Sequence, residues 1–305
     1  MSTYEALDLR YDATIGYGSF GRVDLACSKT AQQYYAVKKF NIHEIVQQAQ
    51  NEYINNERRI LQSLEHPFLV KLICTHMDRV NLYLVMECVE GGEVRDYLID
   101  MSEEDLCNAV RFYSVEVICA FRYMHSKNIV YRDLKPENLL LSKDGHVKLS
   151  DFGLAKVLKG KTYTICGTAE YLAPEILLKK GYNAEVDWWS LGTLVYELIS
   201  GSPPFCGIND EETFDLIKKG DLQIPSKFHE EMREVVETLL NRDPSKRSSA
   251  TSLKWYADID FTKVENKAIE PPFVPAPFAI EELPKLEQDK GEPAMQRERD
   301  LFEDW

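Results

Sequence analysis

The stretch from Tyr131 to Asn138 constrains the fold of this chain more than any other, because it places a carboxylate, an ammonium group and an amide within six residues. These groups belong to Asp133, Lys135 and Asn138. A second carboxylate, Asp151, stands beside a glycine after a segment with the pattern of a short hairpin. We therefore predict that this hairpin returns Asp151 to the side of Asp133.

These four side chains suit the handling of a phosphate chain with a divalent metal. Asp133 could take or orient a hydroxyl proton, and Lys135 could neutralise a phosphoryl oxygen. Asn138 and Asp151 could supply the hard oxygen ligands that magnesium prefers. The rest of the chain is then expected to provide a nucleotide pocket, a second lysine and a substrate surface.

The bulk properties indicate two compact lobes and no membrane anchor. The chain has 305 residues, no apolar run long enough to span a bilayer, no signal peptide and no glycine after Met1 for N-myristoylation. Seven scattered cysteines without a Cys-x-x-Cys pair fit a reducing compartment, so we expect the cytoplasm or the nucleus. The formal net charge of -14 argues against nucleic-acid binding and favours basic partners, although solubility alone would explain it.

A glycine-rich hairpin is predicted near the start, at Gly16-Tyr17-Gly18-Ser19-Phe20-Gly21. Its backbone could approach phosphates closely. A dinucleotide-binding turn would need a helix after the third glycine, but residues 23–27 continue as a strand. An ordinary glycine hairpin remains an alternative.

The next strand, over residues 34–40, places Ala36 and Lys38 on one face by alternation. Lys38 could therefore reach phosphates under the glycine hairpin, whereas Lys39 is interpreted as a solvated lysine. Residues 42–64 read as one helix with Ile45, Ala49, Tyr53 and Ile60 on a common stripe. Within this helix, an inward Glu57 could pair with Lys38, or it could be solvated.

The remaining pattern turns from strands to helices. Residues 68–74 and 81–86 read as strands, and residues 87–92 as a linker whose backbone could meet an adenine edge. Long apolar helices are predicted over 106–125 and 186–199. Asp187 would be costly inside the second helix unless it accepts hydrogen bonds, and we expect these from the backbone near Arg132. From about residue 258 the chain becomes rich in proline and charge, which is typical of an extended tail.

Together these motifs resemble the eukaryotic protein kinases over residues 9 to 257. The resemblance implies an α+β, bilobal fold with a five-stranded antiparallel N-lobe, one major N-lobe helix and a mainly helical C-lobe. It divides the chain into a weakly structured lead (1–8), an N-lobe (9–88), a C-lobe (89–257) and a tail (258–305). The motifs follow the family's order as Gly16-x-Gly18-x-x-Gly21-x-Val23, Ala36-Val37-Lys38, Glu57, Tyr131-Arg132-Asp133-x-Lys135-x-x-Asn138, Asp151-Phe152-Gly153, Ala173-Pro174-Glu175, Asp187-Trp188-Trp189 and Arg247.

The resemblance also implies roles, with ATP and Mg²⁺ as cofactors. Asp133 resembles the catalytic base, Asn138 and Asp151 the magnesium ligands, and Lys38 the phosphate clamp held by Glu57. The implied catalytic residues are Asp133, Lys135, Lys38 and Thr168. The implied ATP-binding residues are Ile15, Gly16, Gly18, Ser19, Phe20, Gly21, Val23, Ala36, Lys38, Glu57, Met86, Glu87, Val89, Glu93, Glu137, Asn138, Leu140, Ser150, Asp151 and Phe302.

Within the family, the activation segment and the proline-rich tail resemble the AGC group of Ser/Thr kinases, and most closely the cAMP-dependent kinases. Thr164 stands where that group carries an activating phosphate, with Arg132 and Lys156 positioned to pair with it. Glu175 and Arg247 resemble the buried ion pair of the C-lobe. A basic substrate motif, Arg-Arg-x-Ser/Thr followed by an apolar residue, is implied by the matches at Glu93, Glu137, Glu170 and Glu197.

Implied partners are basic protein substrates, a cAMP-binding regulatory subunit and an upstream activating kinase. Tyr53, Tyr163 and Phe214 depart from the residues usual at contacts of this subgroup. Phe302-Glu303-Asp304-Trp305 resembles a tail segment that crosses the nucleotide pocket. The terminal motif that would follow it and dock on the N-lobe is missing from the sequence, so we expect that either the chain is truncated or the N-lobe groove is empty or filled by another chain. The alternatives are a basophilic AGC kinase that cAMP does not regulate and a pseudokinase scaffold, although Lys38, Asp133 and Asp151 are all present.

Overall fold

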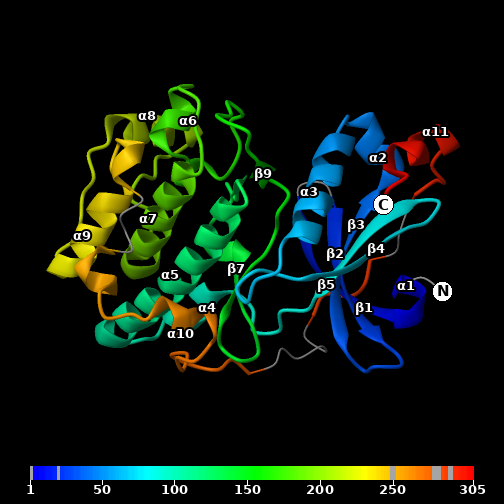
Figure 1. Cartoon of the computed structure of the whole chain (residues 1–305), viewed down its shortest axis with the longest axis horizontal. Coiled ribbons are helices and arrows are strands. Elements are labelled where there is room, and N and C mark those ends of the chain that lie inside the picture. Colours follow the sequence, from blue (N-terminus) through cyan, green and yellow to red (C-terminus); the bar gives the residue numbers. More distant parts are fainter. Residues whose placement is uncertain (1–2, 19–20, 248–251, 277–282, 288–290) are drawn as a thin grey trace. The chain divides into compact units, whose positions relative to one another are not determined.

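The computed structural model describes residues 3–18, 21–247, 252–276, 283–287 and 291–305 (Figure 1). The chain divides into two compact units. The first comprises Met1–Glu65, Val70–Glu90 and Pro277–Trp305, and the second comprises His66–Leu69 and Gly91–Ala276.

A five-stranded antiparallel sheet forms the centre of the first unit, in the order β1-β2-β3-β5-β4. Alternating residues such as Tyr35, Val37, Tyr83 and Val85 are buried in its core. Residues 1–8 are expected from the sequence to be weakly structured, but Thr3–Leu7 form a short helix, α1. Within it, the ring of Tyr4 stacks on the ring of His76, with 4.0 Å between the ring centres. The strands are β1 (Leu9–Gly18), β2 (Gly21–Ser28), β3 (Tyr34–Asn41), β4 (Leu72–Met77) and β5 (Asn81–Glu87), and α1 is Thr3–Leu7.

Two helices replace the single helix predicted over residues 42–64. These are α2 (Ile42–Gln47) and α3 (Asn51–Ser63), separated by a break in which Ala49 adopts a φ of 55°. The break rotates the second helix, so Ala49 and Tyr53 are exposed and the predicted stripe is wrong. The buried side chains of α3 are Ile54, Glu57, Arg58, Ile60 and Leu61.

Lys39 is buried rather than solvated, which corrects the sequence-based interpretation. Its ammonium lies 2.9 Å from Asp24 Oδ2 and 4.0 Å from the centre of the Tyr11 ring. Asp24 is itself fully buried and accepts a hydrogen bond from Thr14 at 2.9 Å. A buried lysine is tolerated here because a carboxylate and an aromatic face replace its lost hydration.

The C-terminal segment packs on the same unit through α11 (Gln296–Arg299) and η7 (Asp300–Phe302). The Trp305 indole donates to the carbonyl oxygen of Tyr83 at 3.2 Å and meets the rings of Phe40 and Phe302 edge to face. The Arg58 guanidinium lies 5.4 Å from the Trp305 ring. Residues 302–305 therefore cover a face formed by α3, β3 and β5. The alternatives for the N-lobe groove of a further terminal motif stay predictions.

The second unit is mainly helical and is built around α5 (Glu103–Ser126) and α7 (Glu185–Ser200) (Figure 1). Both helices bury residues on most sides, as the apolar pattern predicts for α7. For α5 the pattern predicts only one core-facing stripe, and the structure buries more of the helix than that. Together with the sheet of the first unit, this confirms the expected fold class. The other elements are α4 (Val94–Leu98), β6 (Ile129–Val130), η1 (Pro136–Asn138), β7 (Leu139–Leu141), β8 (Val147–Leu149), β9 (Lys156–Val157), η2 (Ala169–Tyr171), α6 (Pro174–Leu177), α8 (Asp210–Lys219), α9 (Glu230–Leu239), η3 (Pro244–Lys246), η5 (Lys254–Tyr256) and α10 (Phe261–Glu265).

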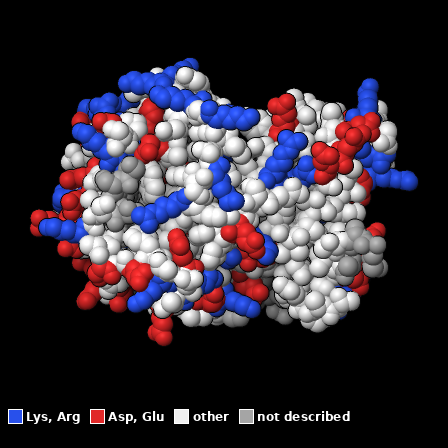
Figure 2. Space-filling model, in the orientation of Figure 1, with Lys and Arg blue, Asp and Glu red and all other residues white. Residues whose placement is uncertain are grey.

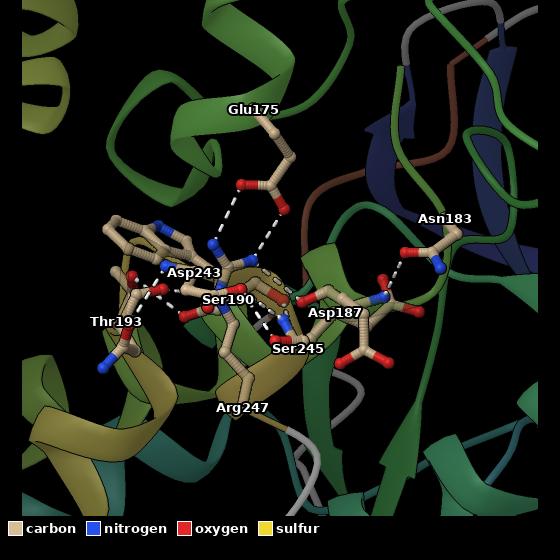
Figure 3. Close-up of polar contacts among 11 residues, drawn as sticks. Glu175, Asn183, Asp187, Ser190, Thr193, Asp243, Ser245 and Arg247 are labelled. Carbon is tan, nitrogen blue, oxygen red and sulfur yellow. Dashed lines mark hydrogen bonds and ion pairs between the residues drawn. The ribbon is translucent and has the colours of Figure 1, made fainter. Parts of the chain in front are cut away.

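A buried ion pair fixes the base of α6 and α7. Figure 3 shows the carboxylate of Glu175 facing the guanidinium of Arg247, with atoms 2.7 and 2.9 Å apart. Arg247 is fully buried, also donates to the carbonyl oxygen of Asn241 at 2.8 Å, and lies 5.0 Å from the Trp189 ring. The ion pair implied for these two residues is confirmed.

Acidic and basic side chains are interspersed on the face drawn in Figure 2. The net charge of -14 therefore does not by itself locate a binding surface there, and individual carboxylates must carry that argument. In the described part of the chain, every helix is too short or too polar to cross a bilayer.

Candidate active site

Asp187, in the first turn of the buried helix α7, fixes the loop that follows β6. Its carboxylate is fully buried and accepts the backbone N–H groups of Tyr131 and Arg132, each at 2.9 Å. His125 lies 2.7 Å from the same carboxylate, at the end of α5. The expected hydrogen bonds between Asp187 and this backbone are confirmed, whereas the contribution of His125 was missed.

This loop and the segment that follows β8 (Val147–Leu149) each contain a residue in a strained backbone conformation. Arg132 has a φ of 69° and Asp151 a φ of 48°, and both lie in the left-handed region that costs non-glycine residues of order 1–2 kcal/mol. The Arg132 guanidinium donates to the carbonyl oxygen of Leu154 at 2.7 Å and to the hydroxyl of Tyr182 at 3.0 Å. These contacts, with those to Asp187, keep the backbone in place.

Asp133 lies at the centre of a small polar cluster and is only 8% exposed. The Asn138 amide nitrogen donates to its Oδ2 at 2.9 Å and to its backbone oxygen at 2.8 Å. Lys135 Nζ lies 3.2 Å from Asp133 Oδ2. Burial raises the pKa of the Asp133 carboxyl, the Lys135 ammonium opposes that shift, and the charge of Asp151 adds to it. The three groups named from the sequence are therefore brought together.

The hairpin β7–β8 returns the chain to this cluster, as predicted. Leu139 pairs with Leu149, and the Ser150 N–H donates to the Asn138 carbonyl oxygen at 3.0 Å. Asp151 then follows, and its Oδ1 accepts the Gly153 N–H at 3.1 Å. Because Asp151 is close enough to influence the pKa of Asp133, the expected return of the second carboxylate is confirmed.

The donor set at this loop fits a magnesium ion that keeps other ligands from water or phosphate. The amide nitrogen of Asn138 donates its hydrogen bonds to Asp133, which leaves the amide oxygen of Asn138 as the atom that could bind a metal. Asp151 supplies a carboxylate from the adjacent strand end. Within the described ranges, no group of three or more His, Cys, Asp or Glu side chains forms a complete metal cage. Two protein oxygens without a cage are typical of magnesium sites that share the ion with phosphates.

In the first unit, Lys38 and Glu57 form a buried ion pair. Lys38 Nζ lies 2.7 Å from Glu57 Oε1, and the two residues are 5% and 2% exposed. Glu57 is therefore inward, and the alternative of a solvated helix carboxylate is excluded. The pair fixes the lysine of β3 against α3 and leaves its ammonium able to meet a second anion.

The glycine-rich segment is an antiparallel hairpin of β1 and β2, which excludes a dinucleotide-binding turn. A side chain at Gly18 would meet Lys38 Cε at 3.2 Å, so the tip of the hairpin lies over the lysine. A side chain at Gly21 would collide with the carbonyl oxygen of Lys39, so only glycine fits there. Ser19 and Phe20 lie outside the described residues.

Other residues expected at the nucleotide lie on neighbouring strands of this sheet. Val23 pairs with Lys38, and Ala36 pairs with Met86, so these four residues share one region of the sheet. The exposed Ile15 and the half-buried Gly16 and Val89 belong to the same unit, as does Glu87, which accepts the Lys71 N–H at 2.8 Å. Phe302 is buried against Trp305 and is 1% exposed. The contact of these residues with ATP stays a prediction.

In the second unit, two of the predicted substrate-binding glutamates share an arginine that the sequence analysis missed. Arg95 Nη2 lies 3.1 Å from Glu93 Oε2, and Arg95 Nη1 lies 3.5 Å from Glu137 Oε1. Arg95 escaped notice because its spacing on the five-residue helix α4 is ordinary, and its partner Glu137 is distant in sequence.

Glu197 and Glu170 complete this group of carboxylates. Tyr171 donates its hydroxyl to Glu197 Oε2 at 2.6 Å. Burial raises the pKa of Glu197, that hydrogen bond opposes the shift, and Glu137, Arg95 and Glu170 are near enough to contribute. Glu137, Glu170 and Glu197 therefore lie in one electrostatic neighbourhood, to which Glu93 is joined through Arg95. Their binding of a substrate stays a prediction.

The predicted phosphorylation site is linked by a tyrosine to the loop that follows β6, residues 131–135, called the catalytic loop below. Tyr182 donates its hydroxyl to the carbonyl oxygen of Thr164 at 2.6 Å and accepts a hydrogen bond from Arg132. Lys156 donates to Thr162 at 3.1 Å. Thr168 is the half-buried N-cap residue of η2, and Leu140 bridges to Glu93. Tyr182 carried no motif in the sequence, which is why its linking role was missed.

Comparison with known proteins identifies the family. The protein kinase domain model matches residues 9–256. The chain is 42% identical over 306 residues to a "cAMP-dependent protein kinase, catalytic subunit-like" protein of Caenorhabditis elegans, covering 96% of this chain and 76% of that protein. It is 38% identical over 316 residues to the human cAMP-dependent protein kinase catalytic subunit PRKX, covering 99% and 88%. It is 40% identical over 280 residues to cAMP-dependent protein kinase type 3 of Saccharomyces cerevisiae, covering 89% and 70%. The chain therefore belongs to the protein kinase family, as a serine/threonine protein kinase similar to the catalytic subunits of cAMP-dependent protein kinase.

Proposed function

We propose that this kinase transfers the γ-phosphoryl group of ATP to Ser or Thr hydroxyls that follow arginines at the second and third preceding positions. The observation that carries the proposal is the Asp133 cluster, in which a buried carboxylate contacts both Lys135 and Asn138 on a loop anchored by Asp187. The position of each group matches a step that phosphoryl transfer requires.

Asp133 would orient the substrate hydroxyl and accept its proton as the hydroxyl oxygen bonds to the γ-phosphorus and the bond to the leaving β-phosphate oxygen breaks. Lys135, 3.2 Å from that carboxylate, would neutralise the γ-phosphoryl oxygens. These residues position the reactants and neutralise charge, and no covalent enzyme intermediate forms, because the substrate hydroxyl attacks the γ-phosphorus directly.

Asn138 and Asp151 would hold magnesium, which when bound neutralises charge on the phosphates of ATP. In the other unit, Lys38 would bind phosphate oxygens, and its pairing with Glu57 at 2.7 Å fixes its ammonium for that purpose. The Gly18 tip over Lys38 supports a phosphate-covering role for the hairpin.

The test is transfer of label from ATP to an Arg-Arg-x-Ser peptide. Asp133→Asn is expected to lower kcat by about 10²- to 10⁴-fold with ATP binding retained, as loss of a general base does. Lys38→Met is expected to abolish turnover, whereas Lys29→Met, at an exposed lysine paired only with Asp8 in the described structure, should leave turnover unchanged. Full activity of Asp133→Asn would contradict the proposed role, and no transfer by the wild-type chain, even with Thr164 phosphorylated, would favour the pseudokinase alternative.

For specificity, we propose that Glu93, Glu137 and Glu197 bind the substrate arginines, with Glu170 beside them. Carboxylates and guanidinium groups form bidentate pairs that contribute both affinity and selectivity. The electrostatic proximity of Glu137, Glu170 and Glu197 supports a shared site. A positional-scanning peptide array with no arginine preference at the two preceding positions would reject it.

For regulation, we propose that phosphorylation of Thr164 by an upstream kinase orders the segment through Arg132. Hydrogen bonds that run from Arg132 to Tyr182 and from Tyr182 to Thr164 support this. A phosphate on Thr164 would therefore lie near the Arg132 guanidinium, which belongs to the catalytic loop. A cAMP-binding regulatory subunit is proposed as a partner. A pull-down with and without cAMP tests it, and recovery of no cAMP-sensitive partner would favour a basophilic kinase that cAMP does not regulate.

A further inference from the structure

Arg95 occupies the very carboxylates that the proposed function assigns to substrate arginines. From α4, its guanidinium reaches Glu93 at 3.1 Å with one nitrogen and Glu137 at 3.5 Å with another. Glu93 is the residue before α4, and Glu137 lies in η1 beside the catalytic loop. The two acidic residues are thus joined by a cation that belongs to the chain.

The exposure of these side chains allows exchange with a ligand. Arg95, Glu93 and Glu137 have side chains 44%, 32% and 49% exposed. Ion pairs at such exposure are weak, because water and salt screen them and the side chains lose conformational freedom. A guanidinium from a peptide, presenting the same fork of donors, could therefore replace Arg95.

The charge of Arg95 also acts on the neighbouring carboxylate of Glu197. Arg95 opposes the rise in the pKa of Glu197, while Glu137 and Glu170 add to it. Arg95 therefore compensates part of the negative charge of the whole group, and its removal would leave that group with one more net negative charge for a basic peptide.

We propose that Arg95 is an internal competitor for the substrate-arginine site, which peptide arginines must displace before they bind. The proposal rests on the assignment of Glu93, Glu137 and Glu197 as arginine-binding residues. It identifies Arg95 as a residue that sets the strength of arginine selection: the kinase selects basic peptides less strongly than its glutamates alone would.

The test compares KM for two peptides that differ only in having Arg-Arg or Ala-Ala before the x-Ser acceptor. The readout is the ratio of KM for the alanine peptide to KM for the arginine peptide. Two exposed ion pairs correspond to roughly three- to ten-fold in affinity, so Arg95→Ala should raise this ratio by about that factor. Arg95→Lys, which keeps the charge but not the fork, should give an intermediate ratio.

Arg242→Ala is the matched control, because it removes one positive charge from an exposed arginine of the same unit whose hydrogen bond goes to the backbone of Lys219. Its ratio should equal that of the wild type. Thermal melting of each variant checks that the fold is intact; α4 is short and Arg95 is exposed, so melting temperatures should agree within a few degrees. If Arg95→Ala nevertheless melts early, Arg95→Lys alone decides the test.

An unchanged or lower ratio in Arg95→Ala would overturn the inference, because Arg95 would then merely orient the glutamates or be irrelevant to them. Glu93→Gln and Glu137→Gln separate this from failure of the proposed specificity. If the wild-type ratio does not depend on either glutamate, and Arg95→Ala acquires no arginine preference, the assignment of the site itself is wrong. If the ratio does depend on the glutamates but not on Arg95, only the role of Arg95 is rejected.

Discussion

Removing the charge of Glu175 is expected to destabilise the second unit by about 3 kcal/mol. Arg247 is fully buried, and two of its nitrogens donate to the Glu175 carboxylate at 2.7 and 2.9 Å. Glu175→Gln keeps the size of the side chain but leaves the guanidinium charge without a counter-ion. Breaking a buried ion pair in this way typically costs about 3–5 kcal/mol.

The lower end of that range applies because Arg247 keeps other partners. Its guanidinium also donates to the carbonyl oxygens of Asn241 at 2.8 Å and Glu185 at 3.1 Å, and it lies against the Trp189 ring. Glutamine still offers one acceptor oxygen. Glu175→Gln therefore loses one charge-assisted hydrogen bond, worth about 1.5–3 kcal/mol, and the negative charge that neutralises the Arg247 guanidinium.

Urea unfolding of the whole chain, followed by far-ultraviolet circular dichroism, measures the effect. A loss of about 3 kcal/mol corresponds to a fall in Tm of roughly 6–12 °C for a unit of this size. Glu237→Gln, on an exposed position of α9, is the control and should stay within about 0.5 kcal/mol. The double variant Glu175→Leu/Arg247→Met should recover most of the loss, since apolar replacement of a whole buried pair is often nearly neutral. A Glu175→Gln chain within about 1 kcal/mol of the wild type would refute this account of the pair.

Three further outcomes are expected. Asp187→Asn should lower kcat at least about ten-fold in the peptide assay, because one amide oxygen cannot replace the two carboxylate oxygens that accept the backbone N–H groups of Tyr131 and Arg132 at 2.9 Å. Burial lowers the pKa of His66 to about 4, below the ordinary value near 6.5, so on acidification the unfolded chain binds a proton before the folded chain does. The contribution of His66 to the free energy of unfolding in urea should therefore be full above pH 6.5 and decline toward pH 4, and this decline should be smaller in His66→Gln. Trp305→Ala should cost about 2 kcal/mol in urea unfolding, because a large half-buried ring that packs on Phe40 is lost; an unchanged midpoint would show that this contact contributes nothing.

The catalytic loop could be predicted from the sequence because its chemistry is local. Asp133, Lys135 and Asn138 lie within six residues, so any compact turn brings them together. The return of Asp151 followed from the hairpin pattern, and the partner of Asp187 followed from the cost of burying an unpaired carboxylate. In each case a short-range pattern or a strict energetic penalty left few alternatives.

Other features depended on which surface covers a residue, and this a periodic pattern does not contain. Alternation correctly separated Lys38 from Lys39, but both faces of β3 turned out to be covered, so Lys39 is buried beside Asp24. The helix break at Ala49 requires a positive φ that the composition of the segment does not signal. A shift of one residue around the helix, roughly 100°, was enough to bury Ile54 and expose Tyr53.

Long-range partners were the least predictable. Arg95 meets Glu137 across 42 positions of sequence, and Tyr182 meets Arg132 across 50. Trp305 reaches Tyr83 over a separation of 222 residues. Nothing in the local pattern of either partner indicates such a contact, because it depends on the packing of whole elements.

Two left-handed residues, Arg132 in the catalytic loop and Asp151 after β8, have a consequence for efforts to stabilise this kinase. Glycine at Arg132 or Asp151 would relieve about 1–2 kcal/mol of backbone strain at each position. At Arg132 this relief is offset by the loss of the hydrogen bonds that the guanidinium donates to Leu154 and Tyr182, so a selection for heat resistance alone would enrich glycine at Asp151 and not at Arg132. A selection for turnover should keep both side chains, since the proposed roles need the guanidinium and the carboxylate. The two selections would therefore favour different residues at position 151, and thermostable libraries of this enzyme should be screened for activity at this position first.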